Sequence, residues 1–282
     1  MGATPYVTAD EFRAHPTYLD LETLRSGIMD PDAQTAELTN VLLMSSAWAD
    51  NVCNQPLGAH RVDLSTRGRV DADGTLVVFP SDRPVLSVAG VSYGSTLGRM
   101  SYLAAPAARV DRNQTIYIPV GRIAARGQVW VDITYTAGWV STLLAGDAGP
   151  GDRTLTVADP TGITPGTPYR LWSPGAEETV TVSPTWTPSA VTTPPAALTV
   201  PLAAPIVHAH TSGAGLSGMP ADMRLAVVNY TIAQLMRPDT AAEDSYPDTS
   251  LSPGTRQQDS RKDGSGLVAE AERILNSYAR RM

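Results

Sequence analysis

The sequence predicts an α+β protein: a helical core with antiparallel β-strands, interrupted by an inserted small β-barrel or roll. Apolar residues recur with a helical period in residues 30–52, with the period of two of a strand in residues 60–139, and with helical spacing again after residue 218. The 23 glycines and 23 prolines among 282 residues suit many turns between short strands. With 42% hydrophobic and 17% charged residues the chain can bury a core, which argues against global disorder.

The first segments favour helices. Residues 8–24 are expected to hold a short helix or two, because Thr8 and Glu11 have the spacing of a capping box. A stronger helix opens at Asp30-Pro31-Asp32, where proline suits the first turn and the carboxylates lie at the positive end of the helix dipole. Its apolar stripe ends before Gln55-Pro56 and consists of Leu38, Val41, Leu42, Ser45, Trp48, Ala49 and Val52.

Antiparallel strands are expected between residues 60 and 139. Residues 67–70 and 75–79 flank a turn that ends in Gly74, which predicts a hairpin. Further strands are predicted at 85–93, 115–118 and 128–136. In the last of these, alternate apolar residues predict one buried face, and Trp130 on the other face is expected to meet a neighbour.

The sequence pattern of residues 146–215 differs from that of the flanking segments, which predicts an inserted module. Turns rich in proline and glycine separate four short alternating runs, at 154–157, 169–172, 179–182 and 197–200. Strands of this length at near-regular spacing are typical of a small β-barrel or roll.

Helical signals return in the last quarter of the chain. A helix that starts at Met219-Pro220 is expected to end at Arg237-Pro238, and its nearly continuous apolar surface predicts burial on several sides. Residues 239–266 are polar and lack periodicity, which predicts a flexible arm. Residues 267–282 predict a final helix of about four turns, too short to be stable alone in water.

The predicted organisation therefore has five parts. Residues 1–145 form the core, 146–215 the inserted module, 216–238 a core helix, 239–266 the arm and 267–282 a C-terminal docking helix.

Composition argues against several functional classes. A formal net charge of −7 argues against a sequence-independent DNA-binding surface, which needs clustered Lys and Arg. Cys53 is the single cysteine, so neither a disulfide framework nor a thiolate metal cage is expected. The N-terminus lacks the pattern of a signal peptide, and no stretch approaches the ~20 apolar residues of a membrane span. We therefore expect a soluble protein that is made in a reducing compartment and has no membrane contact.

The sequence offers no convergent nucleophile, base and orienting group, so we expect neither enzymatic activity nor a cofactor or metal. His208 and His210 have a spacing that could hold a metal, but further ligands at suitable spacing are missing. Glu177 and Glu178 are adjacent and would point to opposite faces of a strand, which favours ion pairing over catalysis. Cys53 ends a buried helical face and is expected to act as a small hydrophobe.

The order of these elements and their local motifs resembles the head–tail connector (adaptor) family of tailed bacteriophages. The strand end Tyr135-Thr136-Ala137-Gly138-Trp139, followed by the helix start Met219-Pro220-Ala221-Asp222-Met223-Arg224, is the most specific part, and the helix end from Trp48 to Leu57 precedes both. The resemblance covers roughly residues 1–145 and 213–282. The β module is a departure, because compact members pass directly from the Gly-Trp to the Pro-x-Asp helix.

This resemblance implies a virion protein of the phage neck, assembled in the host cytoplasm. It implies a homo-oligomeric ring, expected to be a dodecamer, whose helical connector core docks on the portal protein. The ring would present its other side to the stopper, a head-completion or tail protein, and genomic DNA would pass through its lumen without specific binding. Its role would be mechanical, in virion assembly and DNA ejection.

Two sets of contact residues follow. The portal is expected to contact the C-terminal helix through Leu267, Ala271, Ile274, Leu275, Tyr278, Arg280 and Arg281. Neighbouring subunits are expected to contact half-buried large side chains, namely Trp48, Trp130, Trp139, Tyr230 and Met236.

Alternatives stay open at this point. The C-terminal stripe could instead fold back on the chain's own core, and the terminal arginines could complement the helix dipole. The whole chain could alternatively be a phage decoration or baseplate protein whose β module binds a ligand such as a glycan.

Overall fold

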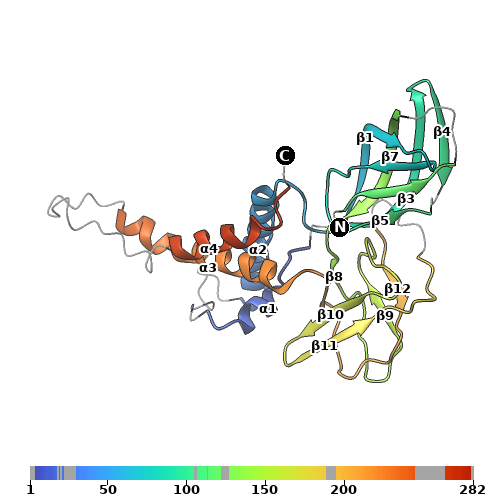
Figure 1. Cartoon of the computed structure of the whole chain (residues 1–282). Coiled ribbons are helices and arrows are strands. Elements are labelled where there is room, and N and C mark those ends of the chain that lie inside the picture. The colour runs from blue at the N-terminus through green and yellow to red at the C-terminus, as the bar shows by residue number, and fades with distance from the viewer. Residues whose placement is uncertain are drawn as a thin grey trace.

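The computed structural model describes residues 4–17, 19, 21, 30–104, 107–112, 114–121, 127–188, 195–244 and 264–280, with the backbone alone for residues 237–244. The described residues form a mixed α+β fold with a helical cluster, a large curled antiparallel sheet and a smaller β module (Figure 1). The sheet and the module lie beside each other, and the helices lie to one side of both. The predicted α+β class is confirmed.

The helical cluster combines both ends of the chain. Its described helices are α1 (Ala9–Ala14), α2 (Pro31–Cys53), α3 (Ala221–Asp244) and α4 (Ser265–Leu275). The predicted starts are confirmed: Thr8 Oγ1 accepts a hydrogen bond from the Glu11 N–H at 3.1 Å, and the Asp30 carboxylate accepts one from the Ala33 N–H at 3.3 Å. One apolar core joins all four helices and includes Phe12, Leu38, Leu42, Met223, Val227, Ala271 and Leu275.

Helix α3 is longer than predicted. It passes through Pro238 and continues to Asp244, so the predicted end at residues 237–238 is wrong. Proline removes one hydrogen-bond donor, but its fixed φ is compatible with the helix, and a helix held by neighbouring packing can continue through it. Residues 239–244 therefore belong to the helix and not to an arm, and residues 245–263 of the predicted arm lie outside the described residues.

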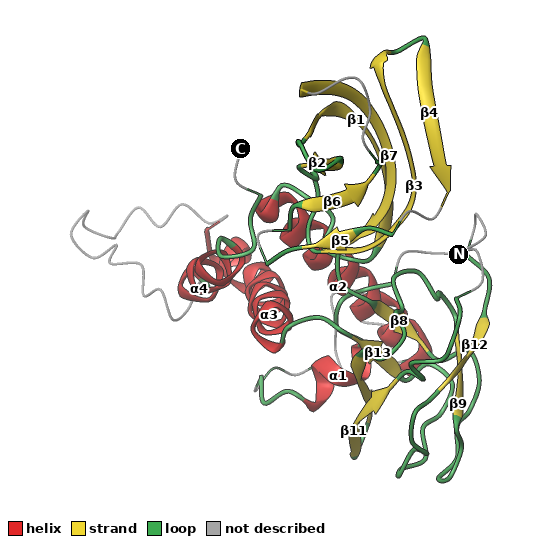
Figure 2. Ribbon diagram, turned by 45° about the vertical axis from the view of Figure 1, so that its right-hand side comes forward, coloured by secondary structure: helices red, strands yellow, loops and turns green. Residues whose placement is uncertain are grey.

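The curled sheet accounts for the chain between α2 and the module. In the described residues its strand order is β4-β3-β7-β1-β2-β6-β5, and every pairing is antiparallel. Figure 2 shows it curling into a half-barrel. The strands are β1 (His60–Val70), β2 (Thr75–Val78), β3 (Val85–Thr96), β4 (Arg99–Ala104), β5 (Arg109–Val110), β6 (Ile116–Pro119) and β7 (Gly127–Ala137).

Strand β1 starts at His60, well before the predicted start at residue 67. Strand β7 pairs with its whole length, from His60 opposite Ala137 to Val70 opposite Gly127. The outward positions of β1 are charged or polar and its inward positions at Val62 and Leu64 are only half-buried, so its apolar signal is weak. Pairing with β7 defines the length of β1, and the local sequence pattern of β1 carries no information about that pairing.

The module has a core of its own. It contains β8 (Ser141–Leu143), β9 (Thr154–Val157), β10 (Pro168–Ser173), β11 (Ala176–Thr181), β12 (Leu198–Pro201) and β13 (Gly215–Ser217). The described strands form two sheets, β11-β10-β13-β8 and β12-β9, around a shared apolar core. The predicted limits 146–215 are too narrow, because β8 precedes them and β13 crosses them. Strands of three residues carry too little alternation to be recognised.

A tight backbone contact joins α2, the curled sheet and the module. The Trp139 N–H donates to Leu57 O at 2.7 Å, and the Ala59 N–H donates to Trp139 O at 2.8 Å. Gly138 has a φ of +96°, and a Cβ at this position would lie 2.4 Å from Gly58 O. Only glycine satisfies both the positive φ and the close approach.

We predict that Gly138→Ala lowers the free energy of unfolding by about 2 kcal/mol or more, because the methyl group meets backbone and cannot move away. Urea unfolding measures the change. The matched control is Gly146→Ala, where a Cβ meets nothing and the change should stay within about 1 kcal/mol. Equal midpoints for the two variants would contradict the role of this contact.

Candidate functional site

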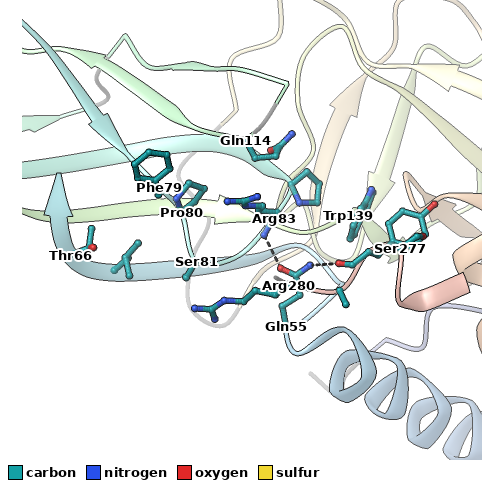
Figure 3. A pocket seen from close by; sticks show the side chains of 14 residues that line it. Gln55, Thr66, Phe79, Pro80, Ser81, Arg83, Gln114, Trp139, Ser277 and Arg280 are labelled. Atoms are coloured by element: carbon teal, nitrogen blue, oxygen red, sulfur yellow. Dashed lines mark hydrogen bonds between the residues drawn. The ribbon is translucent and has the colours of Figure 1, made fainter. Parts of the chain in front are cut away.

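A groove of about 720 Å³ lies between the curled sheet and the C-terminal tail that follows α4 (Figure 3). Strand β1 contributes Leu64 and Thr66, and the loop after β2 contributes Phe79 and Arg83. The tail contributes Arg280 on the other side. Chain segments from three separate regions of the sequence therefore form one concave surface.

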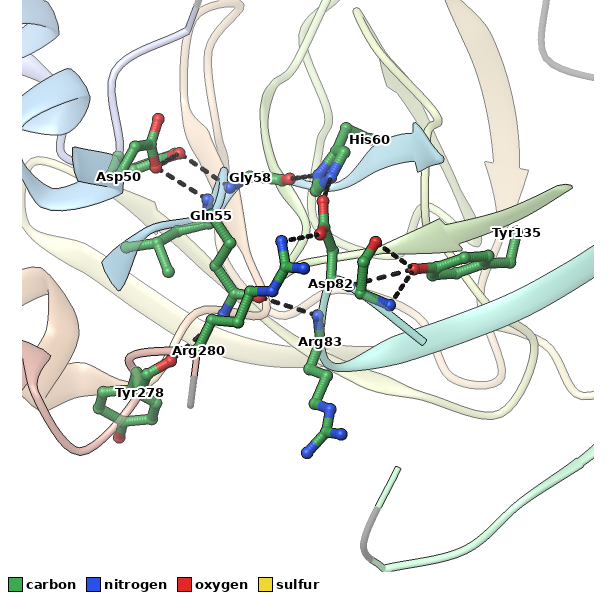
Figure 4. A network of polar contacts seen from close by, with 12 residues as sticks. Asp50, Gln55, Gly58, His60, Asp82, Arg83, Tyr135, Tyr278 and Arg280 are labelled. Carbon is green, nitrogen blue, oxygen red and sulfur yellow. Dashed lines mark hydrogen bonds and ion pairs between the residues drawn. The ribbon is translucent and has the colours of Figure 1, made fainter. Parts of the chain in front are cut away.

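Gln55 links the C-terminal tail, residues 276–280, to the loop of residues 79–84 that follows β2, which we call the groove loop. Its side chain is buried, its Oε1 accepts from the Arg83 N–H at 3.0 Å, and its Nε2 donates to Tyr278 O at 3.2 Å (Figure 4). The Arg280 N–H donates to Cys53 O at 2.9 Å. The end of α2 thus holds the tail and the groove loop in a fixed relation.

A second network holds the groove loop from the sheet side. The Tyr135 hydroxyl accepts from the N–H groups of Ser81 and Asp82, both at 3.0 Å. The Asp82 carboxylate contacts His60 Nε2 at 2.9 Å and Arg280 Nη1 at 3.7 Å (Figure 4). A loop fixed at this many points can present its remaining side chains in a constant geometry.

A partly buried tyrosine–carboxylate pair fixes the turn from α2 into β1. The Tyr6 hydroxyl donates to Asp50 Oδ1 at 2.6 Å, and the same oxygen accepts from the Leu57 N–H at 2.8 Å. Burial raises the pKa of Asp50, although these hydrogen bonds oppose the rise, and burial beside Asp50 also raises the pKa of Tyr6. These groups position the groove but do not line it.

The groove carries positive charge and an exposed aromatic ring. The Arg83 side chain is exposed, and among the described residues no carboxylate lies within ion-pair distance of it. The Arg280 side chain is 42% exposed and shares Asp82 with His60. Phe79 is 65% exposed. On a chain with a net charge of −7, this surface suits acidic groups beside apolar ones.

The predicted portal-contact residues are mostly buried in the chain itself. Ala271, Ile274 and Leu275 belong to the core of the helical cluster, and Leu267 and Tyr278 pack partly against it. The stripe of α4 therefore folds back on the chain's own core, the alternative left open above, and most of the side chains expected to contact the portal are not exposed for it. Arg280 lies at the groove, and Arg281 lies outside the described residues.

The predicted subunit-contact residues also have partners within the chain. Trp48 stacks on Tyr230 with ring centroids 3.8 Å apart, and Trp139 meets Tyr278 edge-on at 5.6 Å. Met236 packs partly against the helical core, and Trp130 lies under the Arg67 guanidinium at 4.4 Å. All five keep part of their surface accessible, so subunit contact stays a prediction for them.

One polar constellation escaped the sequence analysis. Ser173 Oγ lies 2.8 Å from His210 Nδ1, and His210 Nε2 lies 3.0 Å from Glu178 Oε1. These three residue types match those of a serine–histidine–acid catalytic triad. Ser173 is only 6% exposed and His210 only 2% exposed, however, so a substrate cannot reach the Ser173 hydroxyl. The N–H groups of Val207 and His208 also donate to Glu178. The cluster therefore fastens the loop before β13 to the β10–β11 hairpin.

The other residues singled out in the sequence have structural roles. As predicted, Glu177 and Glu178 point apart: Glu177 pairs with Arg170 at 2.7 Å, and Glu178 with His210. The Cys53 thiol is buried, donates to Leu275 O, and has its pKa raised to about 12 by burial and by nearby Asp50. In the part of the chain that the structure describes, no three His, Cys, Asp or Glu side chains gather as metal ligands would.

Comparisons with protein-family models, with curated proteins and with solved structures find no match for the chain. None of the described helices is both long enough and apolar enough to cross a membrane.

We predict that Gln55→Ala lowers the free energy of unfolding by about 1–3 kcal/mol, since it removes the acceptor of the Arg83 N–H and the donor to Tyr278. Hydrogen exchange of residues 276–280 should accelerate with it. Gln128→Ala is the control, because that side chain is exposed on β7 and should change stability by less than about 0.5 kcal/mol. Unchanged exchange in the tail of Gln55→Ala would show that the tail is held by other contacts.

Glu178 should make stability depend on pH. Burial alone would raise its pKa, but hydrogen bonds from His208, Val207 and His210 outweigh this and hold it below the usual value. A lowered folded-state pKa means that the stabilisation is complete above the unfolded value of about 4.3 and is lost as pH falls through the folded value. Glu178→Gln should flatten this acid decline in denaturant titrations, whereas Glu272→Gln, at an exposed position of α4, should preserve it. Identical declines in all three proteins would contradict the assignment.

Proposed function

We propose that this chain is a head–tail connector (adaptor) of a tailed-phage neck, a structural ring that docks on the portal protein and joins it to the stopper or tail. In this proposal the ring is a homo-oligomer, a dodecamer, and genomic DNA passes through its lumen without specific binding. The observation that supports it most is that the three motifs behind the family resemblance meet in one region. We call this region the joint; it is built around the backbone contact of residues 57–59 with residues 138–139.

The joint brings together segments far apart in the sequence. The motif at the end of α2 supplies Leu57, which accepts the hydrogen bond from Trp139 of the strand-end motif. Met219 and Met223, from the helix-start motif, lie in the same apolar core as Leu57. Motifs that lie far apart in the sequence are thus parts of a single structural unit, and this supports the proposal.

The helical connector core of the proposal would use α2 toward neighbouring subunits. Five exposed positions on one face of α2, spaced by three or four residues, carry no charge: Ala36, Asn40, Met44, Ala47 and Asn51. Met44 is 61% exposed and lies one turn from the Trp48–Tyr230 stack. Depletion of charge around exposed apolar and aromatic groups is typical of the core of a protein interface.

Portal docking would involve the accessible end of the C-terminal segment. Because the apolar stripe of α4 is buried, the contact cannot use Ala271 or Leu275 without unfolding the helical cluster. Tyr278 and Arg280, at the rim of the groove, stay available, as does the half-buried Leu267. The proposal therefore retains the C-terminal region as the docking element and changes the surface that it presents.

Native mass spectrometry of the purified chain, alone and co-expressed with the portal of the same phage, tests this function. We expect a ring, and a ring-on-ring complex with the portal. Met44→Asp should disperse the ring into smaller species, because it buries a carboxylate in an apolar contact. Leu97→Asp places the same charge on a 60% exposed apolar residue in the turn between β3 and β4 and should leave the ring intact. A wild-type chain that stays monomeric with and without the portal would refute the proposal.

A further inference from the structure

One edge of β1 lacks a strand partner beside the groove. Strand β7 pairs with β1 from His60 to Val70, whereas among the described residues β2 pairs on the other side at Arg69 and Val70 alone. The edge before Gly68 is therefore open where Leu64 and Thr66 line the groove. An open edge presents backbone N–H and C=O groups to any extended segment that lies alongside.

The open edge carries charged side chains but neither a proline nor a bulge. Residues 61–67 contain no proline, and the pairing of β1 with β7 runs without a register shift. The outer strand β4 differs, because its pairing with β3 is broken by a bulge between Tyr93 and Thr96, and β5 at the opposite end has only two residues. A shortened or bulged edge resists further pairing, whereas the β1 edge is unbroken and faces a groove of about 720 Å³.

The side chains around this edge select the chemistry of an added segment. Arg83 and Arg280 supply positive charge, and the Asp82 carboxylate between them is already engaged by His60 and Arg280. Phe79 exposes its ring on the same groove. An added strand that alternates acidic and apolar residues would therefore meet these arginines and the aromatic ring at once.

We propose that the groove binds an extended acidic segment of a partner protein by strand addition to the open edge of β1. Backbone pairing would supply affinity, and the arginines with Phe79 would supply the preference for acidic and apolar side chains. This inference specifies the kind of segment that the docking region binds. It rests on the proposed function only for the source of that segment, a neighbouring neck protein.

The probe is a fluorescent peptide of nine residues that alternates Glu with Val and Phe, measured by anisotropy against the full chain. We expect binding at about 0.1 mM or tighter, weakened by added salt because the attraction is electrostatic. The same peptide with Lys in place of Glu should bind at least about tenfold more weakly. Equal binding of the two peptides, or no binding of the acidic one at about 1 mM, would overturn the proposal.

Two further peptides test strand addition itself. Each carries N-methyl groups on every second amide, in one of the two alternate registers. A strand that pairs along one edge uses alternate amides, so one methylated peptide should lose binding and the other should retain it. Loss of binding in both peptides, or in neither, would contradict pairing along one edge.

Variants of the chain complete the test. Arg83→Glu should weaken the acidic peptide about tenfold and Phe79→Ser should also weaken it, while Arg153→Glu, an exposed arginine of the module, should not. Unfolding midpoints confirm that the variants fold. If Arg83→Glu changes the oligomeric mass without any peptide, a second copy occupies the groove and the partner assignment is overturned. A chain that assembles on the portal but, in the absence of the portal, does not bind the peptide refutes this inference alone, and peptide binding without portal association refutes the connector alone.

Discussion

The close approach of Gly138 and Trp139 to residues 57–59 is the constraint on which the rest of the structure depends. The two backbones exchange hydrogen bonds at 2.7 and 2.8 Å where a side chain at residue 138 has no room. This contact places the end of β7 against the segment that leaves α2, so the curled sheet cannot turn independently of the helices. The module follows directly after Trp139 and takes its position from the same joint.

Buried polar groups around the joint replace the contacts that a larger apolar core would supply. Gln55, Asp50 and Tyr135 each bond to backbone N–H groups of segments that have no regular secondary structure. The backbone donors of such segments must be satisfied when they are buried, and here Asp50 of α2, Gln55 just after α2 and Tyr135 of β7 satisfy them. The module is tied to the helices in a similar way, by Glu11 of α1 between Arg170 of β10 and Arg224 of α3.

This construction separates a rigid interior from surfaces that stay available. The apolar stripe of α4 is used inside the chain, while the uncharged face of α2, the Arg83–Arg280 groove and the edge of β1 are left exposed. The proposed connector role would need a scaffold that resists deformation and more than one contact surface. The face of α2 lies on a different element from the groove and the adjoining edge of β1, so either surface can be altered without disturbing the other.

The sequence by itself determined the α+β class, the start of α2 at its Asp-Pro cap, the short strands of the module and the apolar stripe of the last helix. These features follow from local periodicity and from capping and turn residues, which act within a few positions of the chain. It did not determine the length of β1, the passage of α3 through Pro238 or the fate of the α4 stripe, because each depends on a segment distant in sequence. The groove is a tertiary product as well: Leu64, Arg83 and Arg280 carry no shared local pattern, and only the pairing of β1 with β7 and the bonds of Gln55 bring them together.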